Sequence, residues 1–396
     1  MTSRYFTPEH DELRASIRRF VETELAPHAD EWEDAAYFAD WVFPRMGELG
    51  FLGLAYPTRY GGQGGDYFCS IVLAEEMARA HSGGIGMAVA VQTDMATPPI
   101  HKFGTEEQKQ RYLVPAIKGQ KVACLGISEP NAGSDVQNVQ TWATRDGAPG
   151  DAGSGWVING SKIFITIGMR ADFITLVART DRGRGFEGVT LFLVDTDTPG
   201  FKRSRKLEKV GMLSSDTAEL SFENMRVPAE AVLGEVGKGF YNIMWELQGE
   251  RMIGAAGAIA GAQLTLDATI AYALEREAFG KPIAAQQVIR HMLVDMAAKI
   301  EVAREYNYAT AYRFGQGEYP VKEISICKLV AGQVAFEVAD TCLQIWGGSG
   351  YMASNPVQRS WRDSRLIRIG GGTDEIMKEI IGKSLGLRAL GVRRPP

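Results

Sequence analysis

The hydrophobic periodicity of this chain changes twice, and this limits its fold more than any other feature. From Thr7 to about Val122, apolar residues recur at the three- and four-residue spacing of amphipathic helices. From about Ala123 to Glu235, short β-branched runs alternate with turn residues, as is typical of strands. Beyond Gly237 the helical spacing returns. This order of helices, strands and helices predicts an α+β protein.

The two changes in periodicity also predict three domains. The chain has 396 residues, more than one hydrophobic core usually organises. We predict an N-terminal α-helical domain over residues 1–122, a middle β-barrel or sandwich domain over 123–235 and a C-terminal four-helix-bundle domain over 236–396. Within the middle domain, Asn159-Gly160 lies between β-branched runs and predicts a hairpin turn.

Net charge and hydropathy bear on whether the protein binds nucleic acid or membranes. The formal net charge of −5 argues against a protein that binds nucleic acid through its phosphates, although Arg388, Arg393 and Arg394 offer a short basic tail. No apolar run of 18 residues occurs, and the charged N-terminal segment lacks the apolar centre of a signal peptide. We therefore expect a cytoplasmic protein that binds neither membranes nor nucleic acid.

The cysteine pattern indicates neither a metal site nor a disulfide framework. Cys69, Cys124, Cys327 and Cys342 are far apart in the sequence, without the C-x-x-C spacing of zinc ligands and without nearby histidine pairs. We expect four free thiols and no bound metal.

Two glycine-rich turns lie close together near the C-terminus. Gly347, Gly348 and Gly350 break one predicted helix, and the run 370–372 precedes Thr373, a suitable N-cap for the helix that follows. Consecutive glycines leave backbone N–H groups uncovered, which is a way to hold a ligand oxygen. From the glycines alone, however, a plain turn between two helices is the favoured interpretation.

The stretch from Cys342 to Ile381 resembles the C-terminal signature of the acyl-CoA dehydrogenase family. These are flavoproteins in which a Gln-Ile-x-Gly-Gly turn and an x-Gly-Thr-x-Glu turn enclose the flavin. The family's three-domain order matches nearly the whole chain. The resemblance implies FAD as the cofactor, with contacts from Gln344, Gly347, Gly348, Thr373 and Glu375.

A departure from the family pattern concerns the catalytic base. Many members carry a glutamate directly before the Gly-Thr pair, where this chain has Gly371, which cannot act as a base. A smaller group, resembling isovaleryl-CoA and long-chain acyl-CoA dehydrogenases, carries the base before an arginine on another helix, here Glu250-Arg251. Apolar neighbours, and Glu246 one turn earlier, are expected to raise the pKa of Glu250. The resemblance implies that the Gly371 N–H stabilises the thioester oxygen and that Arg251 and Gly372 contact the substrate.

Two segments of the predicted β domain resemble flavin-binding motifs of the family. The run LGISEPNAGSD (125–135) follows a predicted strand, and the run Phe164-Ile165-Thr166 resembles the aromatic-Ile-Thr strand that lies along the flavin. By themselves they would be an ordinary loop and an ordinary core strand. The resemblance implies that Ser134 also lies beside the pantetheine arm of the thioester. The implied flavin contacts are Leu125, Ile127, Ser128, Gly133, Ser134, Phe164 and Thr166.

A third segment resembles the part of the family fold that reaches the FAD of a neighbouring subunit. It contains Arg276, Phe279 and Gln287. An arginine fork suits a pyrophosphate because it donates two parallel hydrogen bonds. Without the family context, a helix C-terminus followed by glycine would explain the same residues. The resemblance implies an oligomer, as a homotetramer that is a dimer of dimers.

Taken together, the resemblance implies an oxidoreductase acting on CH–CH donors. It would convert an acyl-CoA to the trans-2-enoyl-CoA in fatty acid or branched-chain acyl metabolism, and pass the electrons to an electron-transfer flavoprotein. Two alternatives remain open. One is a biosynthetic dehydrogenase of an acyl group held on a carrier protein, and the other is a non-catalytic flavoprotein of the same fold that binds nucleic acid. The sequence leaves the length and branching of the acyl chain undetermined.

Overall fold

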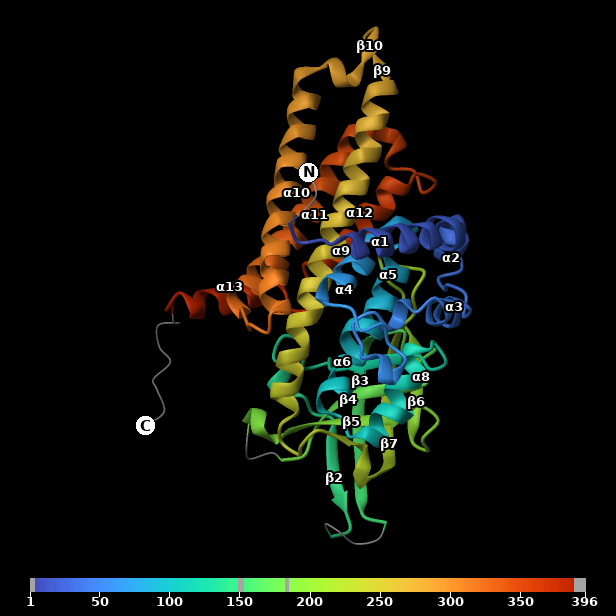
Figure 1. Cartoon of the computed structure of the whole chain (residues 1–396), viewed down its shortest axis with the longest axis vertical. Coiled ribbons are helices and arrows are strands. Elements are labelled where there is room, and N and C mark those ends of the chain that lie inside the picture. Colours follow the sequence, from blue (N-terminus) through green and yellow to red (C-terminus); the bar gives the residue numbers. More distant parts are fainter. Residues whose placement is uncertain (1–3, 149–152, 182–184, 388–396) are drawn as a thin grey trace. The chain divides into compact units, whose positions relative to one another are not determined.

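The computed structural model describes residues 4–148, 153–181 and 185–387 (Figure 1). The chain forms two compact units, Met1–Ile253 and Gly254–Pro396. Helices precede strands and helices follow them, so the predicted α+β class is confirmed. The basic tail residues Arg388, Arg393 and Arg394 lie outside the described residues.

The first unit begins with short helices whose apolar sides are buried. Helix α1 packs against α4, and Ile17, Ile71 and Val72 between them are fully buried. A π-helical turn, Val91–Ala96, directly continues α5. Such turns are rare and occur frequently at functional sites. The helices are α1 (Pro8–Phe20), α2 (Ala29–Asp34), α3 (Val42–Glu48), α4 (Tyr67–Met77), α5 (Gly83–Ala90), α6 (Pro98–Phe103), α7 (Glu106–Gln108) and α8 (Val114–Ile117).

The strands of the first unit form one mixed sheet. Within the described residues its order is β6-β7-β3-β2-β4-β5-β8, and β1 pairs in parallel with β4. Strands β4 and β5 are apolar and buried almost throughout, whereas β6 is an exposed edge rich in Lys and Arg, which discourages pairing with another chain. The strands are β1 (Ala123–Gly126), β2 (Trp142–Asp146), β3 (Gly155–Thr166), β4 (Phe173–Arg179), β5 (Val189–Asp195), β6 (Phe201–Lys206), β7 (Thr217–Pro228) and β8 (Val232–Leu233).

The hairpin predicted at Asn159-Gly160 is wrong. Strand β3 continues through both residues, and its register against β7 shifts there as a β-bulge. Gly160 has φ 145°, and a Cβ at this position would lie 2.7 Å from the Cα of Thr141. The side chain of Asn159 accepts a hydrogen bond of 2.8 Å from the backbone N–H of Asn224. The permissive pair therefore serves a bulge and a close backbone approach instead of a chain reversal.

The second unit is helical and is centred on α11. Helices α10, α12 and α13 all pack against α11 (Figure 1). Helix α12 was not predicted, although Pro356 at its first position and the capping side chain of Asn355, which accepts a 3.0 Å bond from the N–H of Val357, are recognisable start signals. The elements are α9 (Gly239–Glu275), which begins in the first unit, β9 (Glu277–Ala278), β10 (Lys281–Pro282), α10 (Gln287–Gly315), α11 (Val321–Trp346), α12 (Pro356–Ile367) and α13 (Asp374–Ser384).

Helix α9 is long and apolar enough, by length and composition, to cross a membrane. Core helices of soluble proteins meet the same criterion. Met252, Ala255 and Ala273 of this helix are fully buried within the protein. Packing within the protein therefore accounts for part of its apolar character, since 44% of its apolar 18-residue window is buried.

Candidate functional site

The structure brings the two motifs of the predicted β domain together. The N–H of Ile163, in β3, donates a hydrogen bond of 2.9 Å to the carbonyl of Ser128, in the loop after β1. This loop turns back on itself through paired backbone bonds between Glu129 and Ala132. Ser134, which follows, is exposed. A hydroxyl-bearing loop thus lies beside β3, the strand that carries the aromatic residue Phe164.

A buried ion pair, missed by the sequence analysis, supports this loop. Lys162 is fully buried in β3, and its Nζ lies 2.7 Å from Glu129 Oε1 and 2.9 Å from the carbonyl oxygen of Ile127. Glu129 also accepts backbone N–H bonds from Gln140 and Thr141. Burial lowers the pKa of Lys162 to about 8, and Glu129 opposes this shift. Burial would raise the pKa of Glu129, but the charge of Lys162 and these bonds lower it overall.

Phe164 has an unusual backbone conformation. It lies at φ 63°, within a second bulge of β3, and its side chain is 67% exposed. The next residue, Ile165, is buried, and Thr166 pairs with Thr217 of β7. A left-handed conformation is costly for an aromatic residue and tends to persist where function requires it. The bulge turns the Phe164 ring away from the core, as a flat ligand would need.

The predicted base lies in a cluster of ionisable groups at the start of α9. Glu246 is 2% exposed, and neither carboxyl oxygen has a hydrogen-bond partner among the described residues. Burial raises the pKa of Glu246 well above its ordinary value, and the charges of Glu250 and Asp94 raise it further, against the effect of Arg251. Arg251 is itself buried, and Glu250 is partly buried. Tyr67 of α4 donates to the carbonyl of Gly249 at 3.4 Å.

Asp94, in the π-helical turn Val91–Ala96, belongs to the same cluster. Burial raises the pKa of this carboxyl to about 7, although hydrogen bonds from Thr93 and Ser70 oppose the shift. The Thr93 hydroxyl donates to Asp94 Oδ2 at 2.5 Å. The sequence analysis did not identify Asp94, because its proximity to α9 depends on tertiary packing.

In the second unit, the first glycine turn ends α11. Gly347 has φ 59°, and a Cβ at Gly347 or Gly348 would meet nothing within 4 Å. At Gly350, by contrast, a Cβ would lie 2.8 Å from that of Trp346, so this glycine serves packing. Gln344, one turn before, is exposed. The backbone at 347–348 therefore borders open space, which is compatible with the ligand contact that the family resemblance implies.

The second glycine turn leads into α13. Gly371 and Gly372 have φ values of 65° and 100°, which suit glycine. Thr373 is the N-cap, as predicted, and its hydroxyl accepts a 3.3 Å bond from the N–H of Ile376. Buried Lys328 donates to the carbonyl of Gly372 and so anchors the turn from α11. Glu375 follows in the first turn of α13.

The third predicted segment lies at the end of α9. Phe279 and Gly280, both at positive φ, form a two-residue turn between β9 and β10, as expected for a type I′ hairpin. The Phe279 side chain is 96% exposed, and Arg276 and Gln287 are also exposed. Within the described residues of this one chain, these three side chains are not buried by packing.

The sequence and fold were compared with those of known proteins. Residues 7–120, 124–225 and 237–386 match the models for the N-terminal, middle and C-terminal domains of acyl-CoA dehydrogenase. The chain is 37% identical to the long-chain specific acyl-CoA dehydrogenase of Sus scrofa, over 96% of this chain and 87% of that protein. It is also 37% identical to isovaleryl-CoA dehydrogenase of Solanum tuberosum, over 97% and 92%.

A solved acyl-CoA dehydrogenase from Geobacillus kaustophilus is 38% identical and superposes with a TM-score of 0.93, covering 97% of this chain and all of that one. The chain belongs to the acyl-CoA dehydrogenase family. The predicted family and its long-chain and isovaleryl-CoA subgroup are confirmed.

Acyl-CoA dehydrogenases are FAD-dependent, and a solved FAD complex, that of PigA, is 26% identical to this chain with a TM-score of 0.92. The described residues fit this cofactor. The Ser128 loop and the outward Phe164 ring suit a flavin, and the uncovered backbone at Gly347 and Gly348 suits a polar ligand edge. Which residues touch FAD or substrate stays a prediction.

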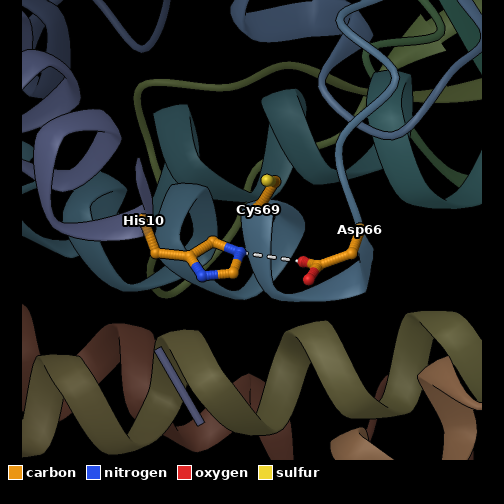
Figure 2. Close-up of side chains that lie close together, drawn as sticks. All are labelled: His10, Asp66 and Cys69. Atoms are coloured by element: carbon orange, nitrogen blue, oxygen red, sulfur yellow. Dashed lines mark hydrogen bonds and ion pairs between the residues drawn. The ribbon is translucent and has the colours of Figure 1, made fainter. Parts of the chain in front are cut away.

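In this acyl-CoA dehydrogenase, the side chains of His10, Asp66 and Cys69 lie close together. Their potential metal-binding atoms are within 4.8 Å of one another (Figure 2). Both ring nitrogens of His10 are already engaged, because Nδ1 accepts from the Thr7 N–H at 3.0 Å and Nε2 lies 2.9 Å from Asp66 Oδ1. Asp66 caps α4 by accepting from the N–H of Phe68. The cluster therefore links α1 to α4. All four cysteines are free thiols, as predicted, and burial raises the pKa of Cys69.

Proposed function

We propose that this protein removes the α-proton of an acyl-CoA with Glu250 and releases the trans-2-enoyl-CoA. The observation that carries the proposal is the placement of Glu250, partly buried beside Arg251 and one turn from the unpaired carboxyl of Glu246. Gly371, at the alternative position of the base in the family, has no side chain that could accept a proton. Acyl-CoA oxidation then requires a base elsewhere, and Glu250 meets that requirement.

Each residue has a defined task in this reaction. Glu250 accepts the proton from the α-carbon. The N–H of Gly371 donates to the thioester oxygen as negative charge develops there. FAD, when bound, supplies the acceptor for the hydride that leaves the β-carbon. The hydroxyl of Ser134 is placed in an exposed loop, where it can meet the pantetheine arm.

The acyl chain itself stays open between several kinds. Relatives named for long-chain and for isovaleryl substrates are 37–38% identical to this chain, and one named for short-chain substrates is 37% identical. Long, short and branched chains are therefore all proposed for the substrate series below.

The proposal extends to partners and location. Reduced FAD must lose its electrons, and an electron-transfer flavoprotein is the proposed acceptor. The exposed hairpin at Phe279 supports assembly into a homotetramer, in which Arg276 and Gln287 reach the FAD of a neighbour. The four free thiols support a reducing, cytoplasmic location.

The test is an anaerobic titration of purified holoenzyme with short, branched and long acyl-CoAs, followed by loss of the oxidised flavin absorbance. We expect the wild type to bleach with one class and Glu250→Gln to bleach at least roughly a thousandfold more slowly with FAD retained, because the base is lost. The exposed Glu235→Gln is the matched control and should behave as the wild type. Full activity in Glu250→Gln would place the base elsewhere, and bleaching only by carrier-bound thioesters would exclude CoA substrates.

A further inference from the structure

The carboxyl of Glu246 is buried without a partner. Glu246 is 2% exposed, and both of its oxygens lack a hydrogen bond within the described part of the chain. Buried polar groups in native proteins nearly always have a partner, because an unmet one destabilises the fold by about 1–3 kcal/mol. A carboxyl group retained at such a site calls for a ligand that completes it.

The position of Glu246 connects it with the reaction. Glu246 and Glu250 are four residues apart on α9, so their side chains leave the same face, about 6 Å apart along the helix axis. The electrostatic influence of Asp94 reaches Glu246 from the π-helical turn Val91–Ala96, and Ser70 of α4 hydrogen-bonds Asp94. Three segments of the first unit therefore direct polar groups to one place beside the base.

The chemistry of this place favours an oxygen on the substrate. Burial raises the pKa of the Glu246 carboxyl and so favours its protonated form. A protonated carboxyl donates one hydrogen bond and accepts others, which complements a hydroxyl or carbonyl group. A plain hydrocarbon chain would offer no hydrogen bond to either carboxyl oxygen of Glu246 and would bury both oxygens further.

We propose that Glu246, with Asp94 beside it, recognises a hydroxyl or oxo group on the acyl chain, a few carbon atoms beyond the bond that is oxidised. The preferred substrate is then an oxygen-substituted acyl thioester. The inference rests on the proposed acyl-CoA dehydrogenation with Glu250 as the base, and it adds the class of acyl group. Glu246 acts here as a specificity residue that contacts the distal chain, whereas Glu250 contacts the reacting carbon.

The experiment compares acyl-CoAs of equal length, with and without a hydroxyl or oxo group at successive positions beyond the β-carbon. The readout is kcat/KM for anaerobic flavin bleaching by the holoenzyme. For one position we expect the wild type to prefer the substituted chain by at least roughly tenfold, as sites built to hydrogen-bond a substrate group do. Glu246→Leu should abolish that preference, measured as the ratio of kcat/KM for the substituted chain to kcat/KM for the plain chain, and Glu246→Gln should keep part of it.

Two further measurements show whether Glu246 acts by binding the substituted chain, and not through protein stability or the chemical step. Gln248→Leu removes another buried polar side chain of α9, two residues away and therefore on a different face, and should leave the preference unchanged. Glu250→Gln holoenzyme, which binds without turnover, should bind the substituted chain more tightly than the plain one by about the same factor as the kcat/KM preference.

Two results would overturn the inference. If the wild type oxidises plain chains as well as every substituted chain, and Glu246→Leu slows all of them equally, the carboxyl holds water only. If no acyl-CoA of either kind bleaches the wild type, the proposed function fails and the inference fails with it. The first result leaves acyl-CoA dehydrogenation intact, so the two failures are distinguishable.

Discussion

At the scale of single residues, burial acts differently on charges with and without partners. Lys162 is fully buried but lies 2.7 Å from Glu129, so the pair remains ionised at neutral pH even though burial lowers the pKa of Lys162 to about 8. Asp94 accepts hydrogen bonds from the hydroxyls of Thr93 and Ser70, and burial raises its pKa to about 7. Glu246 has no partner among the described residues, and burial raises its pKa well above the ordinary value. The paired charges support the fold, and Asp94 and Glu246, with their raised pKa values, lie beside the predicted base.

The raised pKa of Asp94 predicts a pH dependence of stability. Because the folded chain keeps a proton that the unfolded chain has released, stability falls as the pH rises from the unfolded pKa to the folded pKa of about 7, and is constant above it. Asp94→Asn removes this loss. We expect the free energy of unfolding of the wild type, relative to Asp94→Asn, to fall by up to roughly 4 kcal/mol over that range. Urea unfolding at several pH values measures it, and parallel curves for the two proteins would contradict it.

At the scale of elements, β3 carries Phe164 and Thr166, two of the residues predicted to contact the flavin. One 12-residue strand contains the bulge at Gly160, the buried Lys162 and the left-handed Phe164. A regular strand would alternate its side chains and turn Phe164 to a different face. The sequence motif predicted that Phe164 and Thr166 belong to the site. It did not predict the bulges, because a bulge is defined by the strand that lies opposite.

The ion pair between β3 and the Ser128 loop makes a second prediction. Lys162→Met keeps most of the side-chain length but leaves Glu129 buried without its cation, so we expect a loss of about 3–5 kcal/mol in unfolding free energy and weaker FAD retention. Lys202→Met breaks the exposed pair with Glu223 and should cost less than about 1 kcal/mol. Urea unfolding and the ratio of flavin to protein absorbance measure both. Full FAD content and stability in Lys162→Met would show that the pair does not support the loop.

At the scale of the whole molecule, we propose that the hairpin of β9 and β10 takes part in assembly. Phe279 at its tip is 96% exposed and sits at positive φ, an arrangement that gains nothing within one chain. Its neighbours Arg276 and Gln287 are also exposed. An apolar tip flanked by polar groups suits a contact with a second copy of the chain.

Phe279→Asp tests this contact. A carboxylate at the tip would have to be desolvated in an interface, so we expect a smaller oligomer and reduced FAD content, without loss of the folded monomer. Phe279→Leu, which keeps an apolar side chain at the same position, should retain the assembly. Size-exclusion chromatography with light scattering measures the mass. An unchanged mass in Phe279→Asp would exclude the hairpin from the interface.

The sequence alone determined the order of helices, strands and helices, the N-cap at Thr373 and the family motifs. These depend on local periodicity and on short runs of residues, which are readable without knowing the fold. Only the tertiary structure joined Glu129 to Lys162, placed Asp94 near Glu246 and converted Asn159-Gly160 from a predicted turn into a bulge. Each of these depends on residues far apart in the chain, and packing alone decides which distant groups are buried together.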